Sequence, residues 1–305
     1  MSEISVIIPI YNGERHIESC YNSLCAQTFQ KWFAIFINDG SSDKTSILLN
    51  ELASKDNRIK VIHKQNEGVA IARDVGVRHA ETGIVTFLDV DDTLCHNALE
   101  CFVKAFDDDD EIDIVISGIN IVSEKMELLR QLTYIQDTIP SKYAVDKICD
   151  GRIRWQLWAK AFRKKTIDHI IVPKGIRNAE DMAVCLQAMV AANKVKILSK
   201  CLYNYVQVAT SVTHIRPQGI SEDALEAVRF VDRAIGDRIG KNNLDCLSLL
   251  IVSGVLHGGI DLPNKEVKDI LSNHFSINSL RRLNPIKAIN ILLFKLFGIN
   301  LARYI

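Results

Sequence analysis

The first 118 residues alternate short runs of β-branched and other apolar residues with amphipathic stretches. The apolar runs predict strands, and the intervening stretches, with apolar residues three and four positions apart, predict helices. The predicted strands are 5–10, 32–38, 59–63, 84–88 and 113–117, and the predicted helices are 14–26, 44–55, 67–81 and 97–106. Such alternation is typical of an α/β fold with a mostly parallel central sheet flanked by helices.

The pattern changes after Gly118. A mixed region follows to about residue 215, and from Gln218 onward the pattern is helical. The expected elements are a hairpin around 121–135 and helices near 141–149, 180–192, 220–238, 243–256, 263–273 and 286–297. We therefore expect one domain over 1–215, with halves at 1–118 and 119–215, and a helical C-terminal region over 216–305.

Composition excludes several classes of protein. Hydrophobic residues make up 48% of the 305 positions, which is typical of a folded globular chain. The 37 Lys and Arg balance the 37 Asp and Glu, so no overall charge indicates a nucleic-acid partner. The eight cysteines form no CxxC pair and are interpreted as reduced thiols. With no signal-peptide pattern and no run near the roughly 20 apolar residues of a membrane span, we expect a cytoplasmic protein.

Three acids directly follow the predicted strand 84–88: Asp89, Asp91 and Asp92. Ligands of open α/β sheets bind at the carboxyl ends of the strands, where these carboxylates are expected. Clustered carboxylates repel one another unless a cation neutralises them, and oxygen ligands suit Mg²⁺ or Mn²⁺. The alternative is that Asp92 or Thr93 caps a helix beginning near Leu94, which leaves the other two acids unexplained.

A second polar cluster, 38–43, follows the predicted strand 32–38 and belongs at the same sheet edge. Ser41, Ser42 and Asp43 are residues that helix caps prefer, so a turn with an N-cap explains them. Asp39 differs, because a carboxylate before a glycine can accept hydrogen bonds from a base N–H or a ribose hydroxyl. Two acidic strand ends predict a nucleotide-binding cleft.

The end of the first predicted strand excludes two common nucleotide sites. Its sequence, Pro9-Ile-Tyr-Asn-Gly13, has neither the GxGxxG of dinucleotide folds nor the GxxxxGK[ST] of phosphate loops. Neither NAD nor ATP chemistry is therefore expected.

Four segments in this order resemble family 2 of the inverting glycosyltransferases, which have a nucleotide-sugar domain of the A-type fold. They are VIIPIYN at 6–12, NDGSSD at 38–43, NEGVAIAR at 66–73 with Gly76, and FLDVDD at 87–92. The resemblance extends more loosely to about residue 215 through 158–160, 180–181, 203–205 and 211–213. Two departures are Asp74, where such enzymes usually have Asn, and the absence of a proline near 96–97.

The resemblance implies roles for the residues of the donor site. Asp39 would recognise the base, usually uracil, in a pocket lined by Pro9 and Tyr11. Asp89 would contact the ribose or the metal, and Asp91 would bind the divalent ion that bridges the two phosphates. Asp92 is expected to support this loop or cap a helix, with direct ligation as an alternative.

The resemblance also implies a catalytic base, for which Asp181 of the pair Glu180-Asp181 is chosen; the alternative is that both acids simply occupy a first helical turn. Arg73 would reach the base or the phosphates, unless it forms an ion pair with Asp74 on its own helix. Trp158 would stack on an acceptor sugar or belong to the core. His214 would approach the diphosphate from a closing loop. Tyr203 and Tyr205 are expected to share one strand face and to pack.

No acid follows Asp269, while cations accompany the apolar residues of 281–305. That composition predicts either a peripheral contact with an anionic membrane or a helix docked on protein. The expected partners are a nucleotide-sugar donor and a saccharide or lipid-linked saccharide acceptor of lipopolysaccharide, O-antigen or capsule synthesis. A nucleotide-sugar-binding module without catalysis is the main alternative. A sugar nucleotidyltransferase is disfavoured, because no Gly-rich basic loop follows the first strand.

Overall fold

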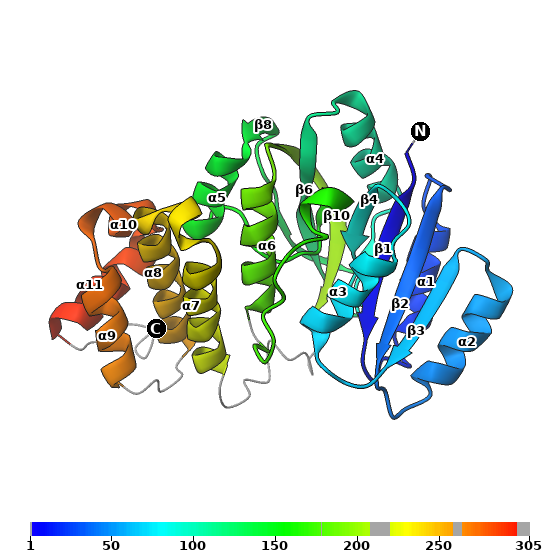
Figure 1. Cartoon of the computed structure of the whole chain (residues 1–305), viewed down its shortest axis with the longest axis horizontal. Coiled ribbons are helices and arrows are strands. Elements are labelled where there is room, and N and C mark those ends of the chain that lie inside the picture. Colours follow the sequence, from blue (N-terminus) through cyan, green and yellow to red (C-terminus); the bar gives the residue numbers. More distant parts are fainter. Residues whose placement is uncertain (1, 178, 208–219, 259–263, 298–305) are drawn as a thin grey trace. The chain divides into compact units, whose positions relative to one another are not determined.

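The computed structural model describes residues 2–177, 179–207, 220–258 and 264–297 (Figure 1). The chain forms two compact units. Their segments are 1–141, 156–175 and 191–215 for unit 1, and 142–155, 176–190 and 216–305 for unit 2. The predicted boundary at residue 215 stays a prediction, since unit 2 also contains two segments from the middle of the chain.

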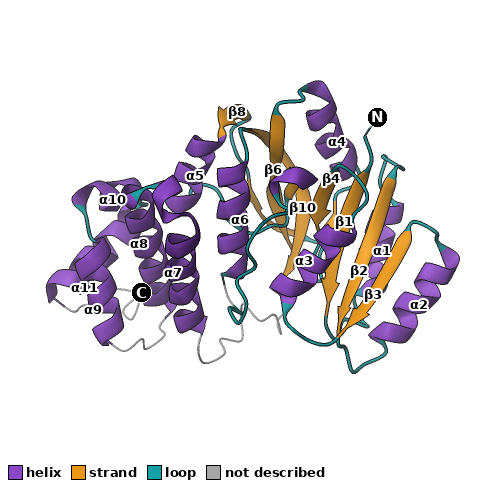
Figure 2. Ribbon diagram, viewed as in Figure 1, coloured by secondary structure: helices purple, strands orange, loops and turns teal. Residues whose placement is uncertain are grey.

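Unit 1 is built on a mixed sheet of ten strands (Figure 2). The strands are β1 (Ile4–Ile10), β2 (Trp32–Asp39), β3 (Ile59–Lys64), β4 (Ile84–Phe87), β5 (Thr93–Leu94), β6 (Ile112–Ser123), β7 (Leu128–Leu132), β8 (Asp137–Pro140), β9 (Lys160–Arg163) and β10 (Lys194–Gln207). Their order is β3-β2-β1-β4-β9-β6-β10-β5, with β7 paired to β6 and β8 to β10.

The first four strands of this order are parallel, as the alternation of predicted strands and helices indicates. Every residue of β1 is buried, which requires cover on both faces. Strand β9 then lies antiparallel between β4 and β6, and β10 is parallel to β6. The sheet is therefore parallel in its N-terminal half and mixed beyond β4.

Helices cover both faces of the sheet. They are α1 (Ile17–Cys25), α2 (Thr45–Lys55), α3 (Val69–His79) and α4 (Ala98–Asp108). Even-numbered residues of β1, from Ile4 to Ile10, share one buried cluster with residues of α1, α2 and α4. Helix α3 packs on the other face, where Gly76 lies directly against Ile7 and Ile37. Even- and odd-numbered residues of β1 face opposite sides of the sheet because side chains along a strand alternate with a period of two residues.

The elements predicted for residues 1–118 are all present, with ends shifted by a few residues. The predicted hairpin around 121–135 is the antiparallel pair β6 and β7. The predictions missed the short strands β5, β8 and β9 and the C-terminal helix α10, and of β10 they placed only the alternating positions of Tyr203 and Tyr205. Except for β10, the missed elements are short, so their sequences carry little periodicity.

Unit 2 is helical in the part that the structure describes. Its helices are α5 (Ser141–Cys149), α6 (Glu180–Ala191), α7 (Ile220–Ile239), α8 (Lys241–Gly258), α9 (Asn264–His274), α10 (Ile277–Arg282) and α11 (Pro285–Phe297). Helix α8 contacts α7, α9, α10 and α11, and its residues Cys246, Leu247 and Leu249 are fully buried. Within the described residues, no helix is both long and apolar enough to cross a membrane.

Candidate functional site

The acid loop, Asp89–Asp92, follows the carboxyl end of β4. The N–H of Leu88 donates to Ile7 O at 3.0 Å and continues the ladder with β1 up to the loop. The N–H of Asp92 then donates to Asp89 O at 3.0 Å and closes a turn. The sheet thus delivers three carboxylates to the edge where the sequence placed them.

Asp92 is held inside the protein by β10. Only 2% of this residue is exposed, and its two carboxylate oxygens accept hydrogen bonds from Tyr203 Oη at 2.6 Å and Val206 N at 2.7 Å. Burial raises the pKa of Asp92 well above its ordinary value, and the charges of Asp91 and Asp89 raise it further. The helix-capping interpretation of Asp92 is wrong, because Thr93 and Leu94 form β5 and α4 begins only at Ala98.

Asp89 is held by Arg73, which reaches the loop from α3. The guanidinium Nη2 donates to Asp89 Oδ1 at 2.8 Å, and the arginine side chain is 7% exposed. The alternative of an Arg73–Asp74 ion pair is wrong, since Asp74 pairs with Arg78 at 2.7 Å. Arg73 therefore belongs to the candidate site and fixes one of its acids.

Asp91 is the remaining carboxylate of the loop. It is half-buried, and no side chain or N–H group of another described residue forms a hydrogen bond or ion pair with it. Burial raises its pKa above the ordinary value, and the charge of Asp89 adds to this. A nearby cation favours the charged carboxylate and would offset both effects, so the arrangement suits a positive ligand. Among the described residues, no three His, Cys, Asp or Glu side chains are grouped to hold a metal by themselves.

Asp39 ends β2 at the same edge of the sheet, with β1 between it and the acid loop. Two strand spacings separate β2 from β4 laterally, about 10 Å. The residue is 3% exposed, and its carboxylate accepts from Lys64 Nζ at 2.6 Å, Glu67 N at 3.1 Å and Gly68 N at 2.8 Å. Burial lowers the pKa of Lys64, but the hydrogen bonds that its side chain makes with the carboxylates of Asp39 and Glu67 raise it overall. Asp39 is thus fixed as a hydrogen-bond acceptor.

The residues directly after β1 are hydrogen-bonded to the residues directly after β2. Pro9 is buried within β1, and Tyr11 just beyond it is 56% exposed. Asn12 has a φ of 51°, in the left-handed region, and its Oδ1 accepts from Ser42 N at 2.8 Å. Its own N–H donates to Ser41 Oγ at 2.9 Å. The serines read from sequence as cap residues therefore tie this segment to the β2 end.

Trp158 precedes β9 and is half-buried. Its ring stacks on Tyr203, with centroids 5.0 Å apart, and on Tyr205, at 5.6 Å. The expectation that the two tyrosines share one face is confirmed. Stacking on the acceptor sugar stays a prediction for Trp158.

Glu180 and Asp181 lie in the first turn of α6, in unit 2, and both are 8% exposed. Negative charge in a first turn interacts favourably with the helix dipole. The assignment of Asp181 as the catalytic base stays a prediction, and so does an acceptor or loop role for Glu180. His214 and the segment 211–213 lie outside the described residues.

Sequence reasoning missed two polar side chains of the site. The ring of Tyr203 packs as predicted, but the contact of its hydroxyl with the acid loop was not predicted. The contact of Lys64 with Asp39 was not predicted either. Lys64 directly follows the predicted strand 59–63 and lies opposite Asp39 in the pairing of β2 with β3, so its position next to that strand was a signal that could have identified it. For Tyr203 no local signal existed, since the contact joins residues 111 positions apart.

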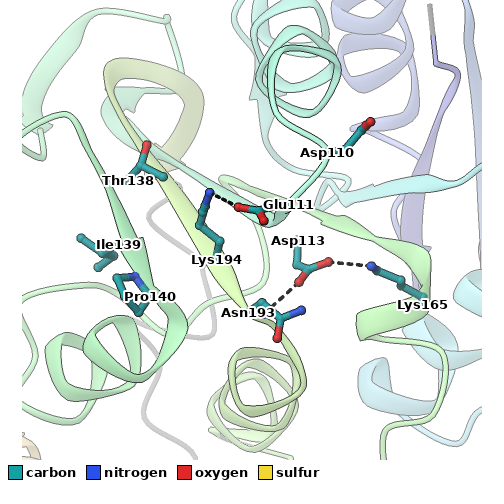
Figure 3. Close-up of a pocket in the computed structure, with 9 residues that line it drawn as sticks. All are labelled: Asp110, Glu111, Asp113, Thr138, Ile139, Pro140, Lys165, Asn193 and Lys194. Carbon is teal, nitrogen blue, oxygen red and sulfur yellow. Dashed lines mark hydrogen bonds and ion pairs between the residues drawn. The ribbon is translucent and has the colours of Figure 1, made fainter.

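A separate polar cavity of about 280 Å³ lies at the amino ends of β6 and β10, the opposite edge from the acid loop (Figure 3). Four of its charged groups pair with one another: Lys165 Nζ lies 3.0 Å from Asp113 Oδ1, and Lys194 Nζ lies 2.5 Å from Glu111 Oε2. None of the predicted site residues lines it. The acid loop therefore remains the candidate site.

Comparisons with known proteins agree with this geometry. The model of glycosyl transferase family 2 matches residues 5–166. An uncharacterized glycosyltransferase of Bacillus subtilis, EpsJ, is 31% identical over 222 residues, which cover 70% of this chain and 63% of EpsJ. Glycosyltransferase GlyG of Streptococcus pneumoniae is 27% identical over 216 residues, 67% of this chain and 71% of GlyG. The chain thus spans less than two thirds of the length of EpsJ.

Solved structures share the fold. The crystal structure of S. aureus TarS 1–349 superposes with a TM-score of 0.70 at 20% identity, covering 99% of this chain and 87% of TarS 1–349. TarS 1–349 in complex with UDP-GlcNAc gives a TM-score of 0.72 at 18% identity. The expected α/β fold of the A type, with C-terminal helices, is confirmed. With more than half of its length matched by the family model, the chain belongs to glycosyl transferase family 2.

Proposed function

We propose that this chain transfers a sugar from a nucleotide-diphosphate donor, a UDP-sugar, to a saccharide acceptor in the synthesis of a bacterial surface polysaccharide, with inversion at the anomeric carbon. The observation that carries the proposal is the acid loop. Arg73 and β10 fix two of its carboxylates, and the third, on Asp91, has no partner among the described residues. The relatives support the reaction class, and the TarS complex with UDP-GlcNAc supports the donor class.

Asp91, with Asp89, would hold Mn²⁺ or Mg²⁺. Mg²⁺ in nucleotide sites takes one or two carboxylates and completes its shell with phosphate oxygens and water. Two available carboxylates at the strand edge fit that donor set, and so does the lack of a three-ligand protein site among the described residues. When bound, the ion would neutralise charge on the diphosphate leaving group.

Asp39 would recognise the base. Each of its oxygens already accepts hydrogen bonds from the protein, and a carboxylate oxygen can accept another from a ring N–H such as that of uracil. Pro9 and Tyr11 would line the same pocket. Since Lys64 and the amides of Glu67 and Gly68 fix the carboxylate, it can present an acceptor in one orientation.

Asp181 would accept the proton of the acceptor hydroxyl as that oxygen attacks the anomeric carbon. General base catalysis of this kind contributes about 10²–10⁴-fold. Asp181→Asn should therefore lower transfer by that factor while donor binding stays unchanged. Asp108→Asn, at an exposed position near the end of α4, makes the same chemical change and serves as the control.

The acceptor is proposed to be lipid-linked, with the enzyme on the cytoplasmic face of a membrane. Helix α11 exposes Ile286 at 65%, Ile289 at 52% and Leu296 at 61%, and exposed Arg281 lies just before it in α10. An apolar helix face beside cations suits an anionic lipid surface. Cosedimentation with phosphatidylglycerol vesicles, reduced by Ile289→Ser and absent with phosphatidylcholine alone, is the expected result.

The experiment that tests the transfer proposal is a thermal-shift screen against UDP-, GDP-, CMP- and dTDP-sugars, each with Mn²⁺, Mg²⁺ or EDTA. Bound ligand stabilises the folded state by mass action, so one nucleotide family should raise Tm in a metal-dependent way. Asp91→Asn should abolish the metal-dependent part, and Asp108→Asn should retain it. Metal-dependent binding without hydrolysis or transfer would favour the non-catalytic module, and a UDP-sugar effect unchanged in Asp91→Asn would refute the metal assignment.

A further inference from the structure

The hydroxyl of Tyr203 joins both ends of the acid loop. It donates to Asp92 Oδ2 at 2.6 Å and accepts from the N–H of Asp89 at 3.2 Å. The tyrosine is fully buried, so water does not compete for these bonds. Its donor and acceptor capacities are both used, which fixes the direction of each hydrogen bond.

Strand β10 makes a second bond to the same loop. Val206 N donates to Asp92 Oδ1 at 2.7 Å, so both oxygens of Asp92 are engaged by one strand. Asp92 points into the protein and closes the loop turn through its own N–H to Asp89 O. The anchoring leaves Asp91 and Asp89 as the carboxylates of this loop that can face a ligand.

These bonds restrict the loop to one arrangement. A buried carboxylate that loses a donor is left with an unmet hydrogen bond, which destabilises the arrangement that the donor supported. Without the Tyr203 hydroxyl, Asp92 and the N–H of Asp89 each lose a partner, and the turn carrying Asp91 can relax. Groups that orient metal ligands act in this way, and their removal weakens metal affinity about 10–100-fold.

We infer that Tyr203 is a positioning residue for nucleotide-diphosphate binding: through Asp92 and the Asp89 N–H it holds Asp91 and Asp89 where they grip a divalent ion and the diphosphate. The inference rests on the proposed function, and it adds a residue of β10 that acts without touching the ligand. It also explains why a tyrosine hydroxyl is buried against the acid loop.

The test is Tyr203→Phe, which removes one oxygen and keeps the ring that stacks on Trp158. Tyr21→Phe is the matched control, because the Tyr21 hydroxyl also donates to an aspartate, Asp56 Oδ2 at 3.0 Å, on α1 and away from the acid loop. UDP binding is measured by calorimetry with Mn²⁺ and with EDTA, and circular dichroism and Tm are recorded for each variant.

The expected result is a Kd for UDP in Mn²⁺ about 10–100-fold higher for Tyr203→Phe, with the Kd in EDTA unchanged. The control should match the wild type in both. Equal Mn²⁺-dependent binding by Tyr203→Phe and the wild type would overturn the positioning role and leave the proposed function intact. So would parallel losses in Mn²⁺ and EDTA, because they would indicate a general structural effect. Absence of Mn²⁺-dependent UDP binding in the wild type would instead overturn the proposed function, and the inference with it.

Discussion

Gly76 on α3 allows the helix to approach the sheet, and replacing it with alanine should destabilise the protein. A Cβ at this position would overlap Ile7 Cγ2 and lie 2.9 Å from Ile37 Cδ1. Both isoleucines are fully buried in neighbouring strands, so neither side chain can move freely. The helix or its partners must shift.

Two opposing effects set the size of the change. Overpacking a core costs about 1–3 kcal/mol, and the short contacts favour the upper end. Alanine in place of glycine stabilises a helix interior by about 1 kcal/mol. The net expectation for Gly76→Ala is about 2 kcal/mol of destabilisation, or a Tm lower by roughly 4–8 °C at about 2–4 °C per kcal/mol.

Differential scanning calorimetry measures the effect, with Gly254→Ala as the matched control. Gly254 also lies inside a helix, α8, but a Cβ there would meet no atom within 4 Å, so only the propensity gain remains. The two substitutions should shift Tm in opposite directions. An increase for Gly76→Ala would refute the close-packing argument. Because Arg73 is one turn away on α3, Gly76→Ala should also weaken Mn²⁺-dependent UDP binding.

Two further predictions concern stability. Hydrogen bonds from Arg58 are the main cause that lowers the pKa of Asp56 from 3.8 to about 2, so the stability they provide is present above pH 4 and is lost as pH falls toward 2. Asp56→Asn should lower Tm at pH 7 and should flatten the decline of Tm between pH 5 and 2. A decline as steep as that of the wild type would contradict this. In unit 2, Arg282 donates to Asn243 Oδ1 at 2.9 Å and lies 3.7 Å from the fully buried carboxylate of Asp150. Arg282→Met should lower the free energy of unfolding by about 2 kcal/mol, seen as a lower urea midpoint, and an unchanged midpoint would show that the contact does not stabilise the fold.

The N-terminal half of the fold could be predicted because most of its strands, such as β1 and β4, are buried on both faces. A strand such as Ile4–Ile10 reads as a continuous apolar run, and the helix on each side repeats at three and four residues. Strand β9 could not be found in this way. Its sequence, Lys-Ala-Phe-Arg, has only four residues, and its place between β4 and β6 depends on pairing with distant segments.

The positions of Asp89, Asp91 and Asp39 were predictable, because a buried strand fixes where the residues at its end emerge. The role of Asp92 was not predictable. Its side chain is bound by β10, and local sequence favours a helix cap at the same position.

The antiparallel strand β9 also determines how much of the chain must be synthesised before the central strands of the sheet can pair. While residues up to 159 are being made, β4 can pair with β1 on one side, but its other side lacks its native partner. An unpaired strand edge with apolar faces is a template for aggregation in a nascent chain. A shortened version ending before Lys160 would therefore retain Asp39 and the acid loop yet expose the side of β4 that leads into that loop. Such a fragment should be insoluble rather than a smaller nucleotide-binding protein.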